Sequence, residues 1–299
     1  MEQIKILDKV EVVRKLPENF KDNDLRYFEH ELKRTFSEVF MFMLDNCTVY
    51  EELLIKQGKF RVVVWNNRSK KRRIFYYIKT LFKRAKNINE DHDKLFCWIV
   101  DDWSSGYFHW FCDVVPKIIF TIKRGMDCVF LLPNEIHKRA YIKESLKRLR
   151  VKFLTFDGGL KLKKLIYIPN LAPSGNYRLE FIRPIKKLLV SQHKEGSAPF
   201  RKIYISRENT GYRKVVNEKE FVNLIKKYGF EVYYFEELNW QQQVKLAQES
   251  KVILSPHGAG LTNMLFMEKG TNVIELRRIN NTHNNCYFAL ANALSIKYF

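Results

Sequence analysis

The sequence lacks several features that would assign it to a class directly. No apolar run approaches the roughly 20 residues that a membrane-spanning helix needs, and residues 1–15 contain no apolar core of a secretory signal. No segment repeats with a period of about 20–50 residues, which excludes a solenoid. The aromatic share of 14% argues against disorder. We therefore expect a globular protein without a membrane span.

Cysteine is scarce as well. The five cysteines lie far apart in the sequence, and no two of them form a CxxC pair. Such spacing is typical of reduced thiols rather than of a disulfide framework or a structural zinc site. Reduced thiols and the lack of a signal pattern together predict a cytoplasmic protein.

Acidic residues are few relative to basic ones. Asp and Glu total 33 against 53 Lys and Arg, which gives a net charge of +20. The first 190 residues carry 38 of the basic and 23 of the acidic residues, so most of the excess lies there. This balance indicates an anionic partner, which leaves nucleic acid, a membrane surface and a phosphorylated substrate as candidates.

The length of 299 residues suits one large domain or two of ordinary size. Residues 191–199 (SQHKEGSAP) are polar and end near a proline, as linkers often do. We place the domain boundary there, with an N-terminal domain at residues 1–190 and a C-terminal domain at residues 191–299.

The last hundred residues alternate between strand and helix patterns. Strand patterns occur at residues 202–206, 230–235, 252–254 and 273–276, and helix patterns at residues 217–228, 240–249 and 261–267. Asn217 is a predicted N-cap in a capping box with Glu220, and Gly229 stands where that helix would stop. The alternation predicts a parallel sheet covered by helices.

The first two thirds of the chain have an α/β pattern that is less regular. Strand candidates lie at residues 60–65, 95–100, 128–132 and 151–155, and the clearest helices lie at residues 107–123 and 134–150. The predicted fold class is therefore α/β throughout.

The sharpest local pattern is SPHGAGLTN at residues 255–263, between a predicted strand and a short helix. Ligands of open α/β sheets bind at the carboxyl edge of the strands, and glycines allow the backbone to approach them closely. A plain strand–turn–helix connection is the alternative, and the polar side chains favour an anion site. The candidate ligand-binding residues of this turn are His257, Gly258, Ala259, Gly260, Thr262 and Asn263.

Further candidates end neighbouring strands of the same half. Ser206 and Arg207 end the first strand, Arg213 follows in the next loop, and Glu275 ends the last strand. A guanidinium group at this edge can neutralise a phosphate by paired hydrogen bonds, and a carboxylate can accept hydrogen bonds from a ribose. A solvated surface position is the alternative for each of them.

In the first half, His109 and Asp113 are four residues apart, so a helix places both on one face. They can act as a general base and its orienting carboxylate, or form a buried structural hydrogen bond. Asp102 and its neighbour Asp101 end the preceding strand. No third ligand is spaced to complete a metal site, so we expect no metal.

Four blocks in order resemble glycosyltransferase family 61, whose members include plant xylosyltransferases and O-linked N-acetylglucosamine transferases. The blocks are GYFHWFCDVVP (106–116), YISRENTGYRKVVNE (204–218), SPHGAGLTNMLFMEKGTNVIEL (255–276) and NNCYFALANALSIKYF (284–299). The sequence departs from the family pattern at Tyr212, which replaces one of a run of arginines, and at residues 268–270, where relatives often have Pro-Pro-Gly.

The resemblance implies a GT-B-like fold, with two Rossmann-like lobes and a cleft between them. Residues 1–190 would then bind the acceptor, and residues 191–299 the nucleotide sugar. It also implies inverting transfer from a nucleotide sugar, such as a UDP-sugar carrying xylose or N-acetylglucosamine, to a hydroxyl of a surface polysaccharide or glycoprotein glycan. The resemblance further implies that no cofactor is required. The missing signal separates this chain from secretory relatives and suggests a bacterial or viral origin.

Two other functions remain open. The net charge of +20 would suit a nucleic-acid-binding protein, although no zinc finger or RNA-recognition motif is present. A catalytically inactive, glycan-binding domain of the same fold is the second alternative.

The segment at residues 68–86 (RSKKRRIFYYIKTLFKRAK) contains nine basic residues and no acidic one. On a helix, Ile74, Ile78, Leu81 and Phe82 would share one stripe, with Phe75 beside it. Such a helix either packs on the N-terminal domain or lies in the interface of an anionic membrane, where a lipid-linked acceptor would be found.

Overall fold

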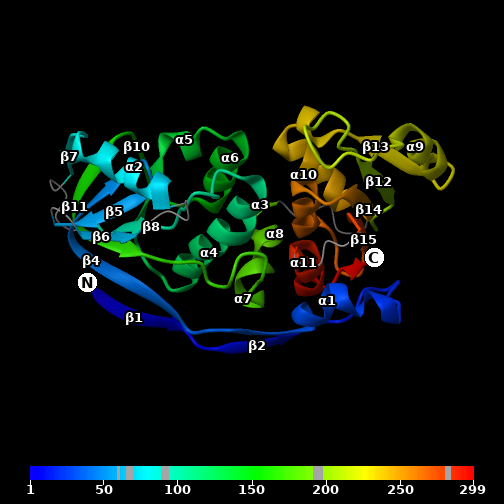
Figure 1. Cartoon of the computed structure of the whole chain (residues 1–299), viewed down its shortest axis with the longest axis horizontal. Coiled ribbons are helices and arrows are strands. Elements are labelled where there is room, and N and C mark those ends of the chain that lie inside the picture. The colour runs from blue at the N-terminus through cyan, green and yellow to red at the C-terminus, as the bar shows by residue number, and fades with distance from the viewer. Residues whose placement is uncertain (59–60, 65–69, 89–93, 191–197, 280–283) are drawn as a thin grey trace. The chain divides into compact units, whose positions relative to one another are not determined.

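The computed structural model describes residues 1–58, 61–64, 70–88, 94–190, 198–279 and 284–299. The chain folds into two compact units (Figure 1). The first unit comprises Met1–Lys9 and Ser37–Ala172, and the second comprises Val10–Phe36 and Pro173–Phe299. Among the described residues, every helix is too short or too polar to span a bilayer.

The first unit is built on a nine-stranded mixed sheet with a main path of β10-β9-β8-β11-β4-β5-β6. Off this path, β1 pairs with β4 and β7 pairs with β11. The strands are β1 (Glu2–Leu7), β4 (Val39–Tyr50), β5 (Leu54–Gln57), β6 (Arg61–Val64), β7 (Ala85–Asn87), β8 (Phe96–Trp98), β9 (Val129–Pro133), β10 (Phe153–Phe156) and β11 (Gly159–Tyr167).

Half of this sheet is parallel. Strands β10, β9, β8 and β11 run in the same direction, and the chain moves outward from β8 to β9 and β10 before it returns to β11 on the other side of β8. This part therefore has a Rossmann-like order, with its topological switch point between β8 and β11. From β11 to β4, β5 and β6 the pairing is antiparallel, which local sequence patterns do not reveal.

The helices of the first unit are α2 (Lys70–Leu81), α3 (Tyr107–His109), η2 (Trp110–Val114), α4 (Val115–Lys123), α5 (Asn134–His137) and α6 (Ala140–Leu149). The predicted helix at residues 107–123 is present without a break, but its middle turn, η2, is a π-helix. Single π turns inside helices occur frequently at functional sites. Trp110 of this turn is fully buried and donates a hydrogen bond to Ser145 Oγ at 2.8 Å.

The second unit contains a five-stranded parallel sheet in the order β13-β12-β14-β15-β16, which confirms the prediction for this half (Figure 1). Its strands are β12 (Arg201–Ile205), β13 (Phe230–Tyr233), β14 (Ser250–Pro256), β15 (Asn272–Leu276) and β16 (Lys297–Tyr298). In order of appearance along the chain this is 2-1-3-4-5, a doubly wound order whose switch point lies between β12 and β14.

The second unit also holds a small hairpin of β2 (Val10–Val13) and β3 (Lys33–Phe36). Its helices are η1 (Asp22–Asp24), α1 (Leu25–Leu32), α7 (Leu179–Ile182), α8 (Pro184–Leu189), α9 (Glu218–Lys226), η3 (Phe235–Glu237), α10 (Trp240–Glu249), η4 (Ala259–Phe266) and α11 (Cys286–Leu294). The helix predicted at residues 240–249 matches α10 residue for residue.

The compact units divide the chain differently from the proposed domains at residues 1–190 and 191–299. Residues 173–190 belong to the second unit, where Arg183 Nε donates to Ala293 O at 2.8 Å and Tyr177 Oη donates to Cys286 O at 3.0 Å. Residues 191–197, the core of the predicted linker, lie outside the described residues.

The predicted capping box at the start of α9 is wrong. Asn217 is the N-cap residue, but its side chain makes no cap hydrogen bond and instead donates to Glu220 Oε2 at 3.4 Å. The buried carboxylate of this turn is that of Glu218, one residue further on.

Candidate functional site

Residues at the carboxyl edge of the second sheet form the first candidate site. Arg207 follows β12 and Gly258 follows β14, so both lie at the switch point between these two neighbouring strands. Parallel sheets of this order bind their ligands at this place. The structure therefore brings together two residues that lie 51 positions apart in the sequence.

The Arg207 guanidinium group packs directly on the backbone of Gly258. A Cβ atom at Gly258 would lie 2.1 Å from Nη1 and 2.8 Å from Cζ of Arg207, so only glycine leaves room for this arrangement. The φ angle of Gly258 is 172°, an extended conformation that any residue can adopt. The glycine is therefore needed for its lack of a side chain and not for its backbone conformation. Within the described part of the chain, the buried Nε–H of Arg207 has no acceptor.

Tyr212, one of the two departures from the family pattern, lies between Arg207 and Arg213 in the sequence of this loop. Its ring is 5.3 Å from Cζ of Arg207 and 5.4 Å from Cζ of Arg213. A guanidinium group over a tyrosine ring is held by cation–π attraction. The loop thus keeps two cations together, even though it has one arginine fewer than the family pattern.

Ser206 has a structural role in the same loop. Its hydroxyl donates to Glu218 Oε1 at 2.6 Å and accepts the backbone N–H of Glu208 at 3.1 Å. Tyr204 Oη donates to the same Glu218 oxygen at 2.7 Å. Burial and the adjacent Glu218 carboxylate raise the pKa of Tyr204. Glu218, which sequence reasoning missed, therefore ties the end of β12 to the start of α9.

His257, Glu275 and Tyr298 form a buried hydrogen-bonded group at the same edge. Glu275 Oε1 pairs with His257 Nδ1, and Glu275 Oε2 accepts the hydroxyl of Tyr298. A carboxylate accepts, so Nδ1 of His257 carries the hydrogen and Nε2 is left for another partner. Burial, followed by the charge of Glu275, raises the pKa of Tyr298. Both oxygens of Glu275 thus have partners within the protein, so Glu275 positions His257. The predicted contact of Glu275 with a ribose stays a prediction.

The rest of the glycine turn packs inward. Thr262 and Asn263 are fully buried, and Asn263 Nδ2 donates to Gly260 O at 3.0 Å. A Cβ atom at Gly260 would lie 3.1 Å from Cγ2 of Ile205, so this glycine allows η4 to approach β12 closely. Ala259 begins η4, a 3-10 helix that confirms the short helix predicted after the glycine turn. Gly260, Thr262 and Asn263 therefore shape the turn from within, whereas Gly258 is the residue of the turn that contacts Arg207.

The second candidate site lies at the switch point of the first sheet. His109 Nδ1 and Asp113 Oδ2 are 2.7 Å apart, as the predicted pair requires, and the π turn holds Asp113 within the buried part of the helix. The imidazole is 28% exposed, whereas the carboxylate is 5% exposed. Asp113 therefore orients a histidine whose ring reaches the surface.

Lys117 is a member of this site that sequence reasoning missed. It is 2% exposed, and its Nζ donates to Asn170 Oδ1 at 2.9 Å. Burial lowers the pKa of Lys117, while the nearby carboxylates of Asp101 and Asp113 oppose that shift. The available signal was a single lysine in the otherwise apolar run VVPKIIFTI at residues 114–122.

Asp101 and Asp102 differ in their surroundings. Asp101 Oδ1 accepts from the backbone N–H of Trp103 and from Ser104 Oγ, both at 2.9 Å, so it fixes the turn after β8. Asp102 is half-buried next to it. Within the described residues, no three His, Cys, Asp or Glu side chains group as metal ligands would.

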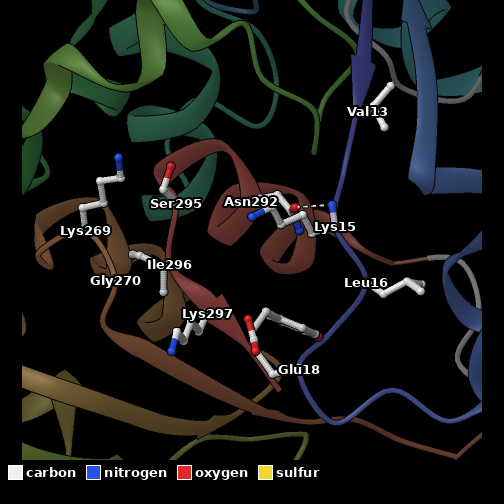
Figure 2. Close-up of a pocket in the computed structure, with 11 residues that line it drawn as sticks. Val13, Lys15, Leu16, Glu18, Lys269, Gly270, Asn292, Ser295, Ile296 and Lys297 are labelled. Atoms are coloured by element: carbon white, nitrogen blue, oxygen red, sulfur yellow. Dashed lines mark hydrogen bonds between the residues drawn. The ribbon is translucent and has the colours of Figure 1, made fainter.

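A separate pocket of about 450 Å³ lies within the second unit. Figure 2 shows it between the chain at residues 13–18 and the segments around Gly270 and Lys297. Gly270 precedes β15 and Lys297 begins β16, so the pocket lies at the amino edge of the sheet, opposite to Arg207 and Gly258. It is therefore distinct from the site at the switch point.

Comparison with known proteins identifies the family of this chain. The family model for glycosyltransferase 61 matches residues 107–274, which include His109, Arg207 and Gly258. The EGF domain-specific O-linked N-acetylglucosamine transferase of Rattus norvegicus is 32% identical over 130 residues, which cover 42% of this chain and 24% of that protein. The protein of the same name from Drosophila melanogaster is 31% identical over 134 residues, or 44% of this chain and 25% of its own.

The aligned region spans about a quarter of the length of these relatives. The family model, in contrast, covers more than half of the chain. The chain belongs to glycosyltransferase family 61, a family of enzymes that transfer sugars.

Proposed function

We propose that the protein is an inverting glycosyltransferase that moves a sugar from a nucleoside diphosphate sugar to a hydroxyl group of a glycan or protein acceptor. The relatives are named as transferases of N-acetylglucosamine, which makes UDP-N-acetylglucosamine the first donor to test and UDP-xylose the second. The acceptor would belong to a surface polysaccharide or a glycoprotein glycan, including a lipid-linked one.

The contact between Arg207 and Gly258 is the observation that carries this proposal. It supplies a guanidinium group at the switch point of a 2-1-3-4-5 parallel sheet, where phosphate-bearing ligands bind. Arg213, whose guanidinium group also lies over the Tyr212 ring, adds a second cation. Two cations beside a tight turn suit a diphosphate, because hydrogen bonds between charged groups are the strong ones.

In the proposed reaction, the acceptor oxygen attacks the anomeric carbon from the side opposite to the leaving diphosphate. The new carbon–oxygen bond forms as the sugar–phosphate bond breaks, and the acceptor proton passes to Nε2 of His109. Asp113 accepts the Nδ1–H of that ring and stabilises the imidazolium that forms. Asp102 is the next candidate for the base.

Charge that grows on the diphosphate would be stabilised by Arg207, Arg213 and the amides at residues 258–260. His257, with Nδ1 engaged by Glu275, would contribute Nε2 as a further contact. Because arginines supply the cationic groups, we expect transfer to proceed without a divalent metal.

The proposal gives each compact unit one task, as in a GT-B-like enzyme. The proposed base lies in the first unit, and the proposed contacts to the donor lie in the second. The switch point between β8 and β11 supports a binding role for the first unit on the same grounds as for the second.

Calorimetry with a panel of nucleotides and nucleotide sugars tests the donor site. We expect a UDP-sugar to bind and Arg207→Ala to weaken binding by about 1.5–3 kcal/mol, the range for a hydrogen bond to a charged group. Lys251→Ala is the control, because it removes an exposed cation at the opposite edge of the same sheet. Equal affinity of wild type and Arg207→Ala would remove Arg207 from the donor site.

The configuration of the product, read by NMR, tests inversion, and addition of a chelator tests independence of metal. RNA binding at two salt concentrations, measured in parallel, tests the nucleic-acid alternative. Donor binding without any transfer would favour the inactive, sugar-binding alternative.

A further inference from the structure

The helix α2 (Lys70–Leu81) turns its apolar stripe outward. Five large apolar side chains are about half exposed or more, with exposed fractions from 48% at Ile78 to 85% at Phe82 just beyond the helix. The others are Ile74, Phe75 and Leu81. Of the 19 large apolar side chains that are exposed in the described chain, five thus lie within nine consecutive residues. Scattered exposed apolar residues are normal, but such a cluster indicates a binding surface.

The opposite face of α2 attaches the helix to the first unit. Thr80 is buried, and the ring of Tyr77 lies 4.8 Å from Nζ of Lys56 on β5. At the end of the helix, Lys83 pairs with both Glu51 and Glu52. Polar and aromatic side chains therefore hold the helix in place, which leaves the apolar stripe for something outside the unit.

The charge around the stripe identifies the kind of partner. Residues 68–86 contain nine basic residues and no acidic one, and Glu51 and Glu52 offset the charges of Lys79 and Lys83. The segment keeps an excess of positive charge, so a partner that covers the stripe must tolerate or attract it. A second copy of the chain, docked symmetrically through this helix, would bring the same cations together and be repelled. An anionic lipid bilayer offers both an apolar interior and negative headgroups.

We propose that α2 docks the protein on an anionic membrane surface. Ile74, Phe75, Ile78, Leu81 and Phe82 enter the boundary between headgroups and acyl chains, and the exposed side chains of Lys79, Arg84 and Lys86 contact the headgroups. This attachment is peripheral, because no described helix is able to span the bilayer. It is independent of the proposed reaction and would place the first unit at the lipid surface.

Co-sedimentation with vesicles tests the proposal on the full chain. One set of vesicles contains phosphatidylcholine alone, and the other contains phosphatidylcholine with phosphatidylserine, each at low and high salt. We expect pelleting with the phosphatidylserine vesicles, reduced by salt, and little with the neutral ones. Each neutralised cation, for example in Arg84→Gln, should weaken vesicle binding about fivefold.

The double variant Phe75→Ser/Phe82→Ser tests the apolar stripe, and we expect at least about a tenfold loss of vesicle affinity per phenylalanine. Its matched control is Phe200→Ser/Tyr228→Ser, which removes two exposed aromatic side chains from the second unit. Both variants alter exposed residues, so thermal unfolding and donor binding should match wild type.

Equal pelleting with both kinds of vesicle, or pelleting with neither, would overturn the proposal. So would unchanged binding of Phe75→Ser/Phe82→Ser. Analytical ultracentrifugation tests whether a second copy of the chain covers the stripe instead. A wild-type protein that dimerises but does not bind vesicles, and a double variant that is monomeric, would assign the stripe to a second copy.

Discussion

At the scale of single residues, the close packing of Arg207 on Gly258 yields the sharpest test of the donor site. Gly258→Ala is compatible with the extended backbone, but its Cβ atom must displace the guanidinium group. We expect the variant to fold and to bind the nucleoside diphosphate about 10–100-fold more weakly, because most of the Arg207 contribution is lost.

A double-mutant cycle then isolates the cause. In an Arg207→Ala background, Gly258→Ala should cost almost nothing further, because no guanidinium group remains to be moved. Calorimetric affinities of the four proteins give the coupling energy. Additive losses would mean that Gly258 acts on the ligand directly and not through Arg207.

The pair of His109 and Asp113 gives the second prediction. His109→Ala should lower the rate of transfer by about 10²–10⁴-fold, the usual contribution of a general base, while donor affinity stays unchanged. Asp113→Asn should lose less, because it retains a hydrogen-bonding group beside Nδ1. His137→Ala, in the same unit, is the control for loss of a histidine. If Asp113→Asn proves the more damaging change, the carboxylate is the base.

Replacement of the buried Lys117 should affect stability and activity in different ways. Lys117→Met replaces an ammonium group by an apolar side chain of similar length, and it removes the cost of burying that charge, which outweighs the attraction of Asp101 and Asp113 in its effect on the Lys117 pKa. The variant should therefore unfold at the same temperature as wild type or higher, yet transfer more slowly, because Asp101 and Asp113 lose a cation. The exposed Lys123→Met in the same helix is the control.

The free energy of unfolding should also depend on pH through the titration of Lys117. Its pKa is lowered in the folded state, so the unfolded chain binds more protons between that value and 10.5. Across this window the free energy of unfolding of wild type should rise with pH relative to Lys117→Met. Parallel denaturation profiles of the two proteins would contradict the lowered pKa.

At the scale of elements, Glu218 links the end of β12 to the start of α9. Its carboxylate accepts hydrogen bonds from Tyr204 and Ser206, so Glu218→Ala should lower the free energy of unfolding by about 1.5–3 kcal/mol. Glu220→Ala, in the same turn but exposed, should change it by less than about 0.5 kcal/mol. A larger loss from Glu220→Ala, measured by urea denaturation, would restore the predicted capping box.

The same elements show what the sequence does and does not predict. Periodicity and turn residues locate α10, the strands β12 to β15 of the second sheet and the helix from Tyr107 to Lys123, because these signals are local. Strand β1 and the short β16 are defined by pairing with strands that are distant in the sequence, which no local pattern encodes. Lys117 and Glu218 were missed for the same reason, since their partners Asn170 and Tyr204 are brought to them by the fold.

At the scale of the whole molecule, the units do not follow the order of the chain. Val10–Phe36 belongs to the second unit although the sequence on both sides of it belongs to the first. A boundary at a polar linker assumes domains that are continuous in sequence, so no linker signal marks this crossing. Several contacts fix the segment, among them the hydrogen bond from Glu18 N to Tyr298 O at 2.8 Å and the Phe28 ring 4.8 Å from that of Phe288.

Arg14 holds this segment through a buried ion pair with Glu31 and a hydrogen bond to Asn176. It is buried, its Nη1 donates to Glu31 Oε2 at 2.7 Å, and its Nη2 donates to Asn176 Oδ1. Burial lowers the pKa of Arg14, and Glu31 opposes that shift. Loss of one partner from a buried ion pair typically costs about 3–5 kcal/mol, because the remaining charge is left unpaired.

A fragment of residues 173–299 should therefore not fold into a stable donor-binding unit, since Asn176 and the rings of Phe288 and Tyr298 would lose their cover. The same fragment with residues 10–36 fused through a flexible linker should unfold cooperatively and bind the nucleoside diphosphate. Arg14→Ala in the fusion should remove most of that gain. Thermal unfolding and calorimetry of the three proteins check this, and cooperative unfolding with donor binding by the short fragment alone would show that the crossing segment is dispensable.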